Sequence, residues 1–251
     1  MEALPVRRHP GATPAIVALH GFTQHGGMFT ELATELGREI LAPDLPGHGD
    51  AAAVHATFSG AVEAVAAMVD GRPLLGYSQG GRIALGVALE HPGAVSRLVL
   101  ISAGIGIPDK QRRSARQASD EVLARNLERE GLDAFLESWM RLPIFDGLQR
   151  RGATWLAQDR RLRLENTSQG IAAALRGMGQ GVQPPYGGRL EELEMPVLFI
   201  AGGQDTKYVA IGERVARQAQ HGRLVVLDGI GHAVVGEAPR QVADEIERFL
   251  H

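Results

Sequence analysis

Short apolar runs alternate with longer amphipathic stretches along most of this chain, and this alternation limits the folds that it can adopt. The apolar runs are nearly continuous, which is typical of strands buried on both faces of a parallel sheet. They lie at residues 15–19, 39–42, 72–75, 97–101, 196–201 and 223–227. Helical periodicity occupies the stretches at 27–36, 59–70, 80–91, 209–220 and 239–250. The pattern predicts a doubly wound, three-layer α/β domain with a mostly parallel sheet.

The alternation is interrupted once, after the strand expected at 97–101. Residues 104–190 contain no convincing strand but several helical patterns, and Gly131 divides one long stretch into two expected helices. Active sites of open α/β sheets lie at the carboxyl ends of the strands, so a helical insertion there would enclose one. We therefore expect residues 1–103 and 191–251 to form the core, with residues 104–190 as a helical cap inserted in it.

The composition excludes several classes of function. The chain has 251 residues, a net charge of −3 and no cysteine. The charge gives no footprint for nucleic acid or an anionic membrane, and the lack of cysteine excludes disulfides, thiolate metal sites and a cysteine nucleophile. The amino terminus has no apolar core of a secretion signal, and the apolar runs are too short to cross a bilayer. We expect a cytoplasmic protein that acts on a small molecule without a metal or cofactor.

The segment GYSQGG (residues 76–81) fits a G-x-S-x-G motif around Ser78. The motif alone is weak because the chain is rich in glycine, but here it follows an expected strand and precedes an expected helix. That strand–turn–helix context is typical of a nucleophile elbow, in which the serine has a strained backbone and the next amide points at the substrate. The alternative is a glycine-rich strand–helix connection in which Ser78 has no catalytic role.

A serine hydroxyl needs a histidine to take its proton, and that histidine needs an acid to set its tautomer. His232 lies in a glycine-bearing loop after the last expected strand, and Asp205 lies just past the end of another. Asp228 is an alternative acid, but it lies only four residues before His232 on the same strand–loop unit. We favour Asp205. His20 follows the first strong strand and is expected to shape the oxyanion loop.

Two backbone amides are expected to form the oxyanion hole, those of Phe22 and Gln79. The nearby segment DLPGHGD brings Asp44, His48 and Asp50 together in a way that suggests metal ligands. A Pro-Gly loop that joins a strand to a helix explains the same segment without a metal, and we prefer that interpretation.

These motifs together resemble the α/β-hydrolase superfamily. LHGF, DLPGHG, GYSQGG, GGQD and GIGH follow one another in the order that this superfamily has. More narrowly, the chain is similar to the menaquinone-pathway family of 2-succinyl-6-hydroxy-2,4-cyclohexadiene-1-carboxylate synthases. The narrower resemblance rests on GYSQGGR, on DTKY and on three segments of the expected cap, which are RRSARQASDEVLA, ESWMRLPIF and RLRLENTSQGIAAALRGMGQGVQPP.

The resemblance implies a lyase on a hydrolase fold. In this family a serine–histidine pair removes a proton from a cyclohexene that bears several carboxylates, and pyruvate leaves. The implied site residues are the triad Ser78, Asp205 and His232, the carboxylate-binding Arg82, Arg116 and Arg163, and the pocket residues Tyr77 and Trp139. Arg161 lies close to Arg163 in the sequence, and the spacing leaves open which of them faces the site.

Two other functions compete with the lyase. The same triad and oxyanion hole would serve a carboxylesterase that acts through an acyl-serine intermediate. A non-catalytic binding protein on the same fold usually loses part of the triad, and all three members are present here. All but two of the 26 basic residues are arginines, which agrees with bidentate binding of carboxylates but also with genome composition or a heat-loving source.

Overall fold

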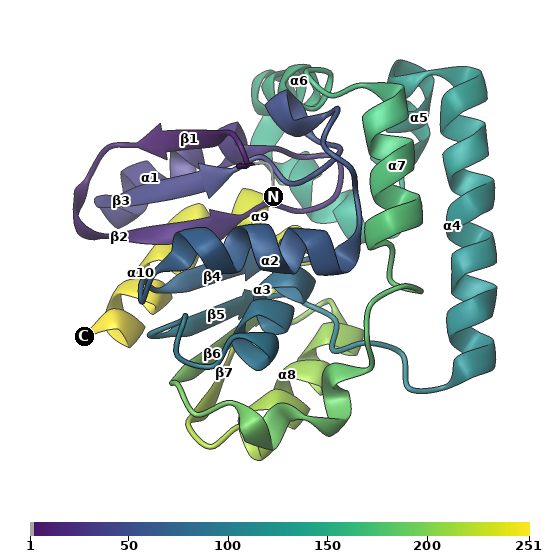
Figure 1. Ribbon diagram of the computed structural model, residues 1–251. Coiled ribbons are helices and arrows are strands. Elements are labelled where there is room, and N and C mark those ends of the chain that lie inside the picture. Colours follow the sequence, from purple (N-terminus) through teal and green to yellow (C-terminus); the bar gives the residue numbers. More distant parts are fainter. Residues whose placement is uncertain (1–2) are drawn as a thin grey trace.

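The computed structural model describes residues 3–251 and shows a seven-stranded sheet covered by helices on both faces (Figure 1). The strand order is β1-β3-β2-β4-β5-β6-β7, and only the β1–β3 pair is antiparallel. The strands are β1 (Val6–His9), β2 (Ala12–Leu19), β3 (Arg38–Pro43), β4 (Leu74–Tyr77), β5 (Leu98–Ile101), β6 (Val197–Gly202) and β7 (Gly222–Leu227). The α/β-hydrolase fold expected from the sequence is confirmed.

Strand β1 is the one strand that the apolar pattern did not predict. Its sequence, VRRH, is short and carries two arginines, and it pairs with β3 so that Val6 lies opposite Pro43 and His9 opposite Ile40. An edge strand exposes one side to solvent and therefore does not need a continuous apolar run. Of the strands that the sequence did predict, β4, β5 and β6 are buried throughout, and β7 is a half-buried edge strand that still has an apolar run.

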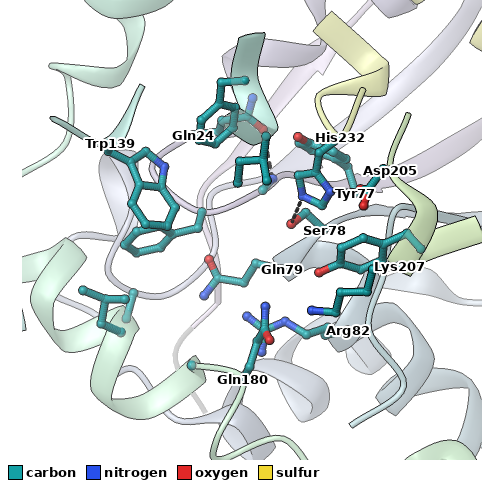
Figure 2. A pocket seen from close by; sticks show the side chains of 18 of the residues that line it. Gln24, Tyr77, Ser78, Gln79, Arg82, Trp139, Gln180, Asp205, Lys207 and His232 are labelled. Atoms are coloured by element: carbon teal, nitrogen blue, oxygen red, sulfur yellow. Dashed lines mark hydrogen bonds and ion pairs between the residues drawn. The ribbon is translucent and has the colours of Figure 1, made fainter. Parts of the chain in front are cut away.

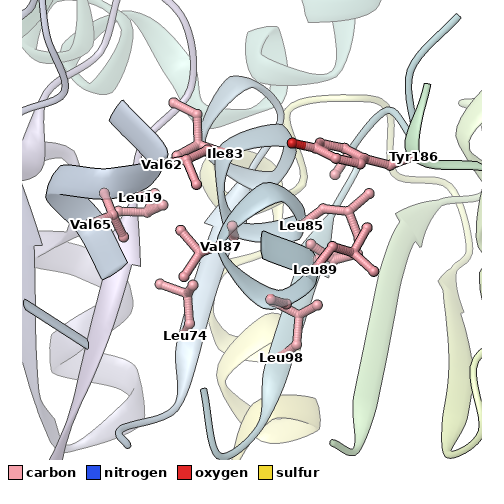
Figure 3. Close-up of a cluster of buried hydrophobic side chains, with 14 of the residues drawn as sticks. Leu19, Val62, Val65, Leu74, Ile83, Leu85, Val87, Leu89, Leu98 and Tyr186 are labelled. Atoms are coloured by element: carbon pink, nitrogen blue, oxygen red, sulfur yellow. The ribbon is translucent and has the colours of Figure 1, made fainter. Parts of the chain in front are cut away.

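Each face of the sheet packs against its own set of helices. One face is covered by α2 (Phe58–Val69), α3 (Gln79–Glu90) and α8 (Thr206–Gln218), and the other by α1 (Thr30–Leu36) and α10 (Pro239–Leu250) (Figure 1). On the first face the two central helices bury Val62, Ile83 and Val87 against Leu19 and Leu74 of the strands (Figure 3). This packing fixes the amino end of α3, where Ser78 lies.

The chain between β5 and β6 is helical and lies beyond one end of the sheet (Figure 1). It contains α4 (Lys110–Glu130), α5 (Leu132–Trp139), the 3-10 segment η3 (Pro143–Arg151), α6 (Gly152–Arg163) and α7 (Ser168–Met178). The expected division at Gly131 is confirmed, since this glycine ends α4 with φ of 85°. The division into core and cap stays a prediction, and residues 1–2 of the expected core lie outside the described residues.

Shorter elements complete the chain. They are η1 (Gly26–Phe29), η2 (Gly49–Ala51), η4 (Tyr186–Gly188), η5 (Leu190–Glu192) and α9 (Val234–Glu237). Within residues 3–251, none of the helices combines the length and the apolar character needed to cross a membrane.

Candidate active site

Ser78 occupies a sharp turn between β4 and α3. Its backbone has φ of 51° and ψ of −106°, a conformation that L-residues rarely adopt. The turn closes because its flanking residues are small: a Cβ on Gly76 would lie 2.5 Å from the Gly80 carbonyl oxygen, and a Cβ on Gly80 would collide with the backbone of Leu19. The glycines of the motif therefore let the elbow pack directly against β2.

Ser78, His232 and Asp205 form a connected hydrogen-bonded chain (Figure 2). The Ser78 Oγ lies 3.2 Å from His232 Nε2, and His232 Nδ1 lies 2.6 Å from the Asp205 carboxylate. The alternative acid, Asp228, is exposed just after β7 and forms no hydrogen bond or ion pair with His232. The structure thus brings together the three residues that the motifs selected, in the order needed for proton transfer.

The loop after β2 lies beside the elbow and carries Phe22. His20 holds this loop, because its Nε2 accepts the Leu45 amide at 2.9 Å while its Nδ1 donates to the Gly21 carbonyl at 2.9 Å. Phe22 and Gln79 both line the cavity next to Ser78. Their position agrees with the expected oxyanion hole, which stays a prediction.

His48 lies beneath this loop, with its ring centroid 4.9 Å from that of His20. Both rings are fully buried, and burial lowers the pKa of His20 well below its usual value and that of His48 to about 4. The Asp44 carboxylate accepts the amides of Gly26 and Asp50 at 2.7 and 2.8 Å. The DLPGHGD segment is thus a loop held by hydrogen bonds within itself and to its neighbours, and no group of three or more possible metal ligands occurs within residues 3–251.

A cavity of about 370 Å³ opens above Ser78. Its lining comes from the strand ends and the loop after β2, from the start of α8, and from the segment between β5 and β6. Trp139 stands at one wall, with its ring 5.3 Å from Phe22 (Figure 2). Tyr77 lies at the floor, buried, with its ring centroid 5.9 Å from that of His232. Both residues therefore lie where the resemblance placed them.

Four basic side chains line the same cavity, namely Arg82, Arg116, Arg163 and Lys207. Arg82 is buried, and burial lowers its pKa to about 10. Its Nη1 donates to the Met178 carbonyl at 2.8 Å, and no carboxylate within residues 3–251 comes within ion-pair distance of it. A guanidinium that is buried without a carboxylate partner carries a cost in free energy.

The two arginines from the inserted helices already have carboxylate partners. Arg116 donates to Asp120 at 2.8 Å and to Gln180 at 3.1 Å, and Arg163 donates to Asp159 at 2.7 Å. Both still line the cavity, whereas Arg161 is exposed and does not. Of the two, Arg163 is thus the one that lines the cavity, and its role in substrate binding stays a prediction.

Lys207 is a cavity residue to which the sequence analysis gave no role. Its Nζ lies 5.0 Å from the centroid of the Tyr208 ring, and its labelled side chain points toward Arg82 in Figure 2. Burial and the nearby Arg116 lower its pKa. The sequence offers one signal for Lys207. It is one of only two lysines in the chain, and it lies two residues after Asp205 in the segment DTKY.

Two polar groups in the cavity wall have no hydrogen-bond partner among the described residues. They are the buried side-chain oxygen of Gln79 and the indole nitrogen of Trp139. A buried polar group without a partner costs free energy, and a bound polar ligand can supply the missing partner. Both residues line the cavity that also contains Ser78.

Comparisons with known proteins show the family to which the chain belongs. A family model described as "Alpha/beta hydrolase family" matches residues 16–245. The chain is an enzyme of the α/β-hydrolase family. Curated relatives of this family are named 2-succinyl-6-hydroxy-2,4-cyclohexadiene-1-carboxylate synthase. One from Salmonella typhimurium (strain LT2) is 30% identical, over 96% of this chain and 95% of the relative. Another from Bacillus subtilis (strain 168), which bears that name provisionally, is 35% identical over 96% and 92%.

Solved structures of the family have the same fold. The MenH structure from S. aureus superposes with a TM-score of 0.91, at 26% identity, over 98% of this chain and 97% of that one. A thermophilic esterase from Thermogutta terrifontis superposes with a TM-score of 0.82 at 23% identity, over 98% of this chain and 92% of the esterase chain. The second similarity concerns the fold alone. The expected membership of the synthase group within the α/β hydrolases is confirmed.

Proposed function

We propose that this protein is a lyase of menaquinone biosynthesis that eliminates pyruvate from 2-succinyl-5-enolpyruvyl-6-hydroxy-3-cyclohexene-1-carboxylate. The observation that carries the proposal is Arg82, a buried guanidinium that has no carboxylate partner among residues 3–251 and lies in the cavity that also contains Ser78. The relatives are named for the product that this elimination would give, 2-succinyl-6-hydroxy-2,4-cyclohexadiene-1-carboxylate, which supports the proposal. A substrate with three carboxylates supplies the negative charge that the cavity needs.

The chemistry follows from the substrate and the triad. The ring hydrogen at C2 is acidic because the neighbouring succinyl carbonyl can take up the electrons as an enolate. His232 accepts the Ser78 proton, and the Ser78 oxygen removes the C2 proton. The electron pair forms the C2–C3 double bond, the old double bond moves to C4–C5, and the C5–O bond breaks. The leaving enolpyruvate takes up a proton and tautomerises to pyruvate.

Each group near Ser78 then has a role in this step. The amides of Phe22 and Gln79 would stabilise the enolate oxygen that forms in the transition state. Arg82, Arg116 and Arg163 would hold the three carboxylates, and Tyr77 and Trp139 would pack against the ring. Asp205 would stabilise the charged form of His232 while it carries the proton. No metal or cofactor is needed for these proton transfers.

A carboxylesterase is the second candidate, because the 3.2 Å contact between Ser78 and His232 would also serve acyl transfer. The two functions differ in what the cations do. An esterase for neutral acyl chains would gain nothing from buried arginines and would bear the free-energy cost of their burial.

The decisive experiment compares two activities of the purified protein. Pyruvate release from the enolpyruvyl substrate is followed with lactate dehydrogenase, through the consumption of NADH. Hydrolysis of p-nitrophenyl acetate is followed through the absorbance of the p-nitrophenolate that is released. The proposal expects fast pyruvate release and slow ester hydrolysis. Absence of pyruvate release together with fast ester hydrolysis would show that the esterase is the correct function.

A further inference from the structure

The carboxylate of Glu237 holds the loop that carries His232. Its side chain is only 1% exposed although it is charged. One oxygen, Oε2, accepts the Gly231 amide at 2.9 Å, and the other, Oε1, accepts the Ala233 amide at 3.2 Å. These are the residues directly before and after His232, so a single carboxylate fixes the backbone on both sides of the imidazole.

The segment η3 contributes the rest of this contact. Arg150 donates from Nη2 to the Glu237 Oε2 at 2.9 Å and to the Gly229 carbonyl at 2.9 Å. Gly147 lies directly against the same carboxylate, where a Cβ would collide with Oε2. The same segment places Ile144 and Phe145 in the cavity wall. One short segment therefore touches both the cavity and the loop of His232.

We propose that Glu237 is a positioning residue for His232, and that Arg150 and Gly147 keep its carboxylate in place. The proposal rests on the triad of the proposed function. His232 must stay within 3.2 Å of Ser78 and 2.6 Å of Asp205 at once, and small displacements of a catalytic group lower the rate steeply. Glu237 does not line the cavity, so it acts through the loop and not on the substrate.

A purely structural role would have a different consequence. Glu237 ends the short helix α9, and its bond to the Ala233 amide also caps the start of that helix. If capping were its whole function, replacing it would lower the melting temperature and leave the reactivity of Ser78 unchanged in the folded protein. The reactivity of Ser78 is therefore the measurement that separates the two roles.

The test uses a fluorophosphonate probe, which labels an activated serine whatever the natural substrate is. We expect Glu237→Ala to slow labelling about 10- to 100-fold at a temperature where circular dichroism shows the variant folded. Glu237→Gln keeps one acceptor oxygen and should lose less. Arg150→Ala should slow labelling about threefold. Arg160→Ala is the matched control, because Arg160 pairs with Asp133 in the same inserted chain and not with the loop.

Gly147→Ala is an independent test, because this variant keeps the Glu237 carboxylate. Gly147→Ala should displace the Glu237 carboxylate and slow labelling in the wild-type background. It should have no further effect once Glu237 is alanine, because nothing remains to be displaced. Equal effects of Gly147→Ala in both backgrounds would overturn the proposed contact.

For the synthase reaction, Glu237→Ala should lower kcat for pyruvate release and leave KM unchanged. Labelling of Glu237→Ala at the wild-type rate would overturn the role of Glu237 and leave the triad intact. A wild type that resists labelling altogether would instead overturn the triad on which both proposals rest. An effect on KM alone would also contradict a positioning role.

Discussion

Arg82→Met is predicted to lower activity and to leave stability unchanged or raised. Burial depresses the pKa of Arg82 from 12.5 to about 10. At 1.36 kcal/mol for each pKa unit, the folded state therefore bears a cost of about 3 kcal/mol for keeping this charge. Methionine fills much of the same volume without a charge. It leaves the Met178 carbonyl without its donor, which costs about 1–3 kcal/mol and offsets most of the gain.

The sign of the pH dependence follows from the same pKa. Because its folded-state pKa is depressed but still about 10, Arg82 is charged in both the folded and the unfolded protein at neutral pH. Its cost is therefore constant across the neutral range and is relieved only as the pH rises through about 10. Urea unfolding of wild type and Arg82→Met at pH 7 should give free energies of unfolding that differ by about 2 kcal/mol or less, with the variant equal or higher.

Activity should move in the opposite direction. Loss of a charge-assisted contact to a substrate carboxylate should cost about 2–4 kcal/mol, or roughly 30- to 900-fold in kcat/KM for pyruvate release. Hydrolysis of a neutral ester by the same variant should change little, since Ser78 and His232 are untouched. Arg125→Met is the control, because Arg125 pairs with Glu121 on the outer side of α4. Normal kcat/KM in Arg82→Met, or a large loss of stability, would refute the reasoning.

Three further predictions concern the elbow and the acid. Ser78→Ala should lower kcat at least about a thousandfold. Ser78→Gly should be more stable than Ser78→Ala by about 1 kcal/mol, because glycine adopts the positive φ of this position without strain. Equal melting temperatures of the two variants would argue against strain. Asp205→Asn should reduce pyruvate release by several orders of magnitude while Asp228→Asn is mild, and the reverse ranking would mean that the wrong acid has been chosen. Gly80→Ala should unfold the elbow or prevent soluble expression, because its Cβ would meet backbone and not a mobile side chain; a soluble, active variant would contradict this.

The central sheet and the triad were predictable because each has a local signal. Buried parallel strands appear as continuous apolar runs, and the elbow is defined by glycines next to Ser78 in a strand–turn–helix context. Asp205 was separable from Asp228 because the ends of neighbouring strands meet at one edge of the sheet. These inferences need only the direction of the chain and the order of its elements.

The cavity wall was less predictable because it depends on how the inserted helices approach the sheet. Arg161 and Arg163 differ by two positions on one helix, which is about 200° of rotation, so only the packing of α6 decides which is buried. Lys207 and the unpartnered Gln79 oxygen become significant only when α4 and α8 are seen to meet at one cavity. The sequence gives the spacing of these residues along the chain, but it does not show how the inserted helices pack against the sheet.

The two buried imidazoles beneath the Phe22 loop set an acid limit for the fold. Because the pKa values of both histidines are lower in the folded protein, the unfolded chain binds more protons than the folded protein at acidic pH. The free energy of unfolding therefore falls as the pH drops below the ordinary histidine pKa of 6.5. For His48 alone, whose folded pKa is about 4, the loss reaches about 3 kcal/mol at pH 4. His20 adds to this loss, because burial lowers its pKa and a positive His48 ring 4.9 Å away lowers that pKa further. Two histidines that take no part in the proposed proton transfer therefore make the whole fold less stable in acid, and both lie beneath the loop that is expected to stabilise the enolate.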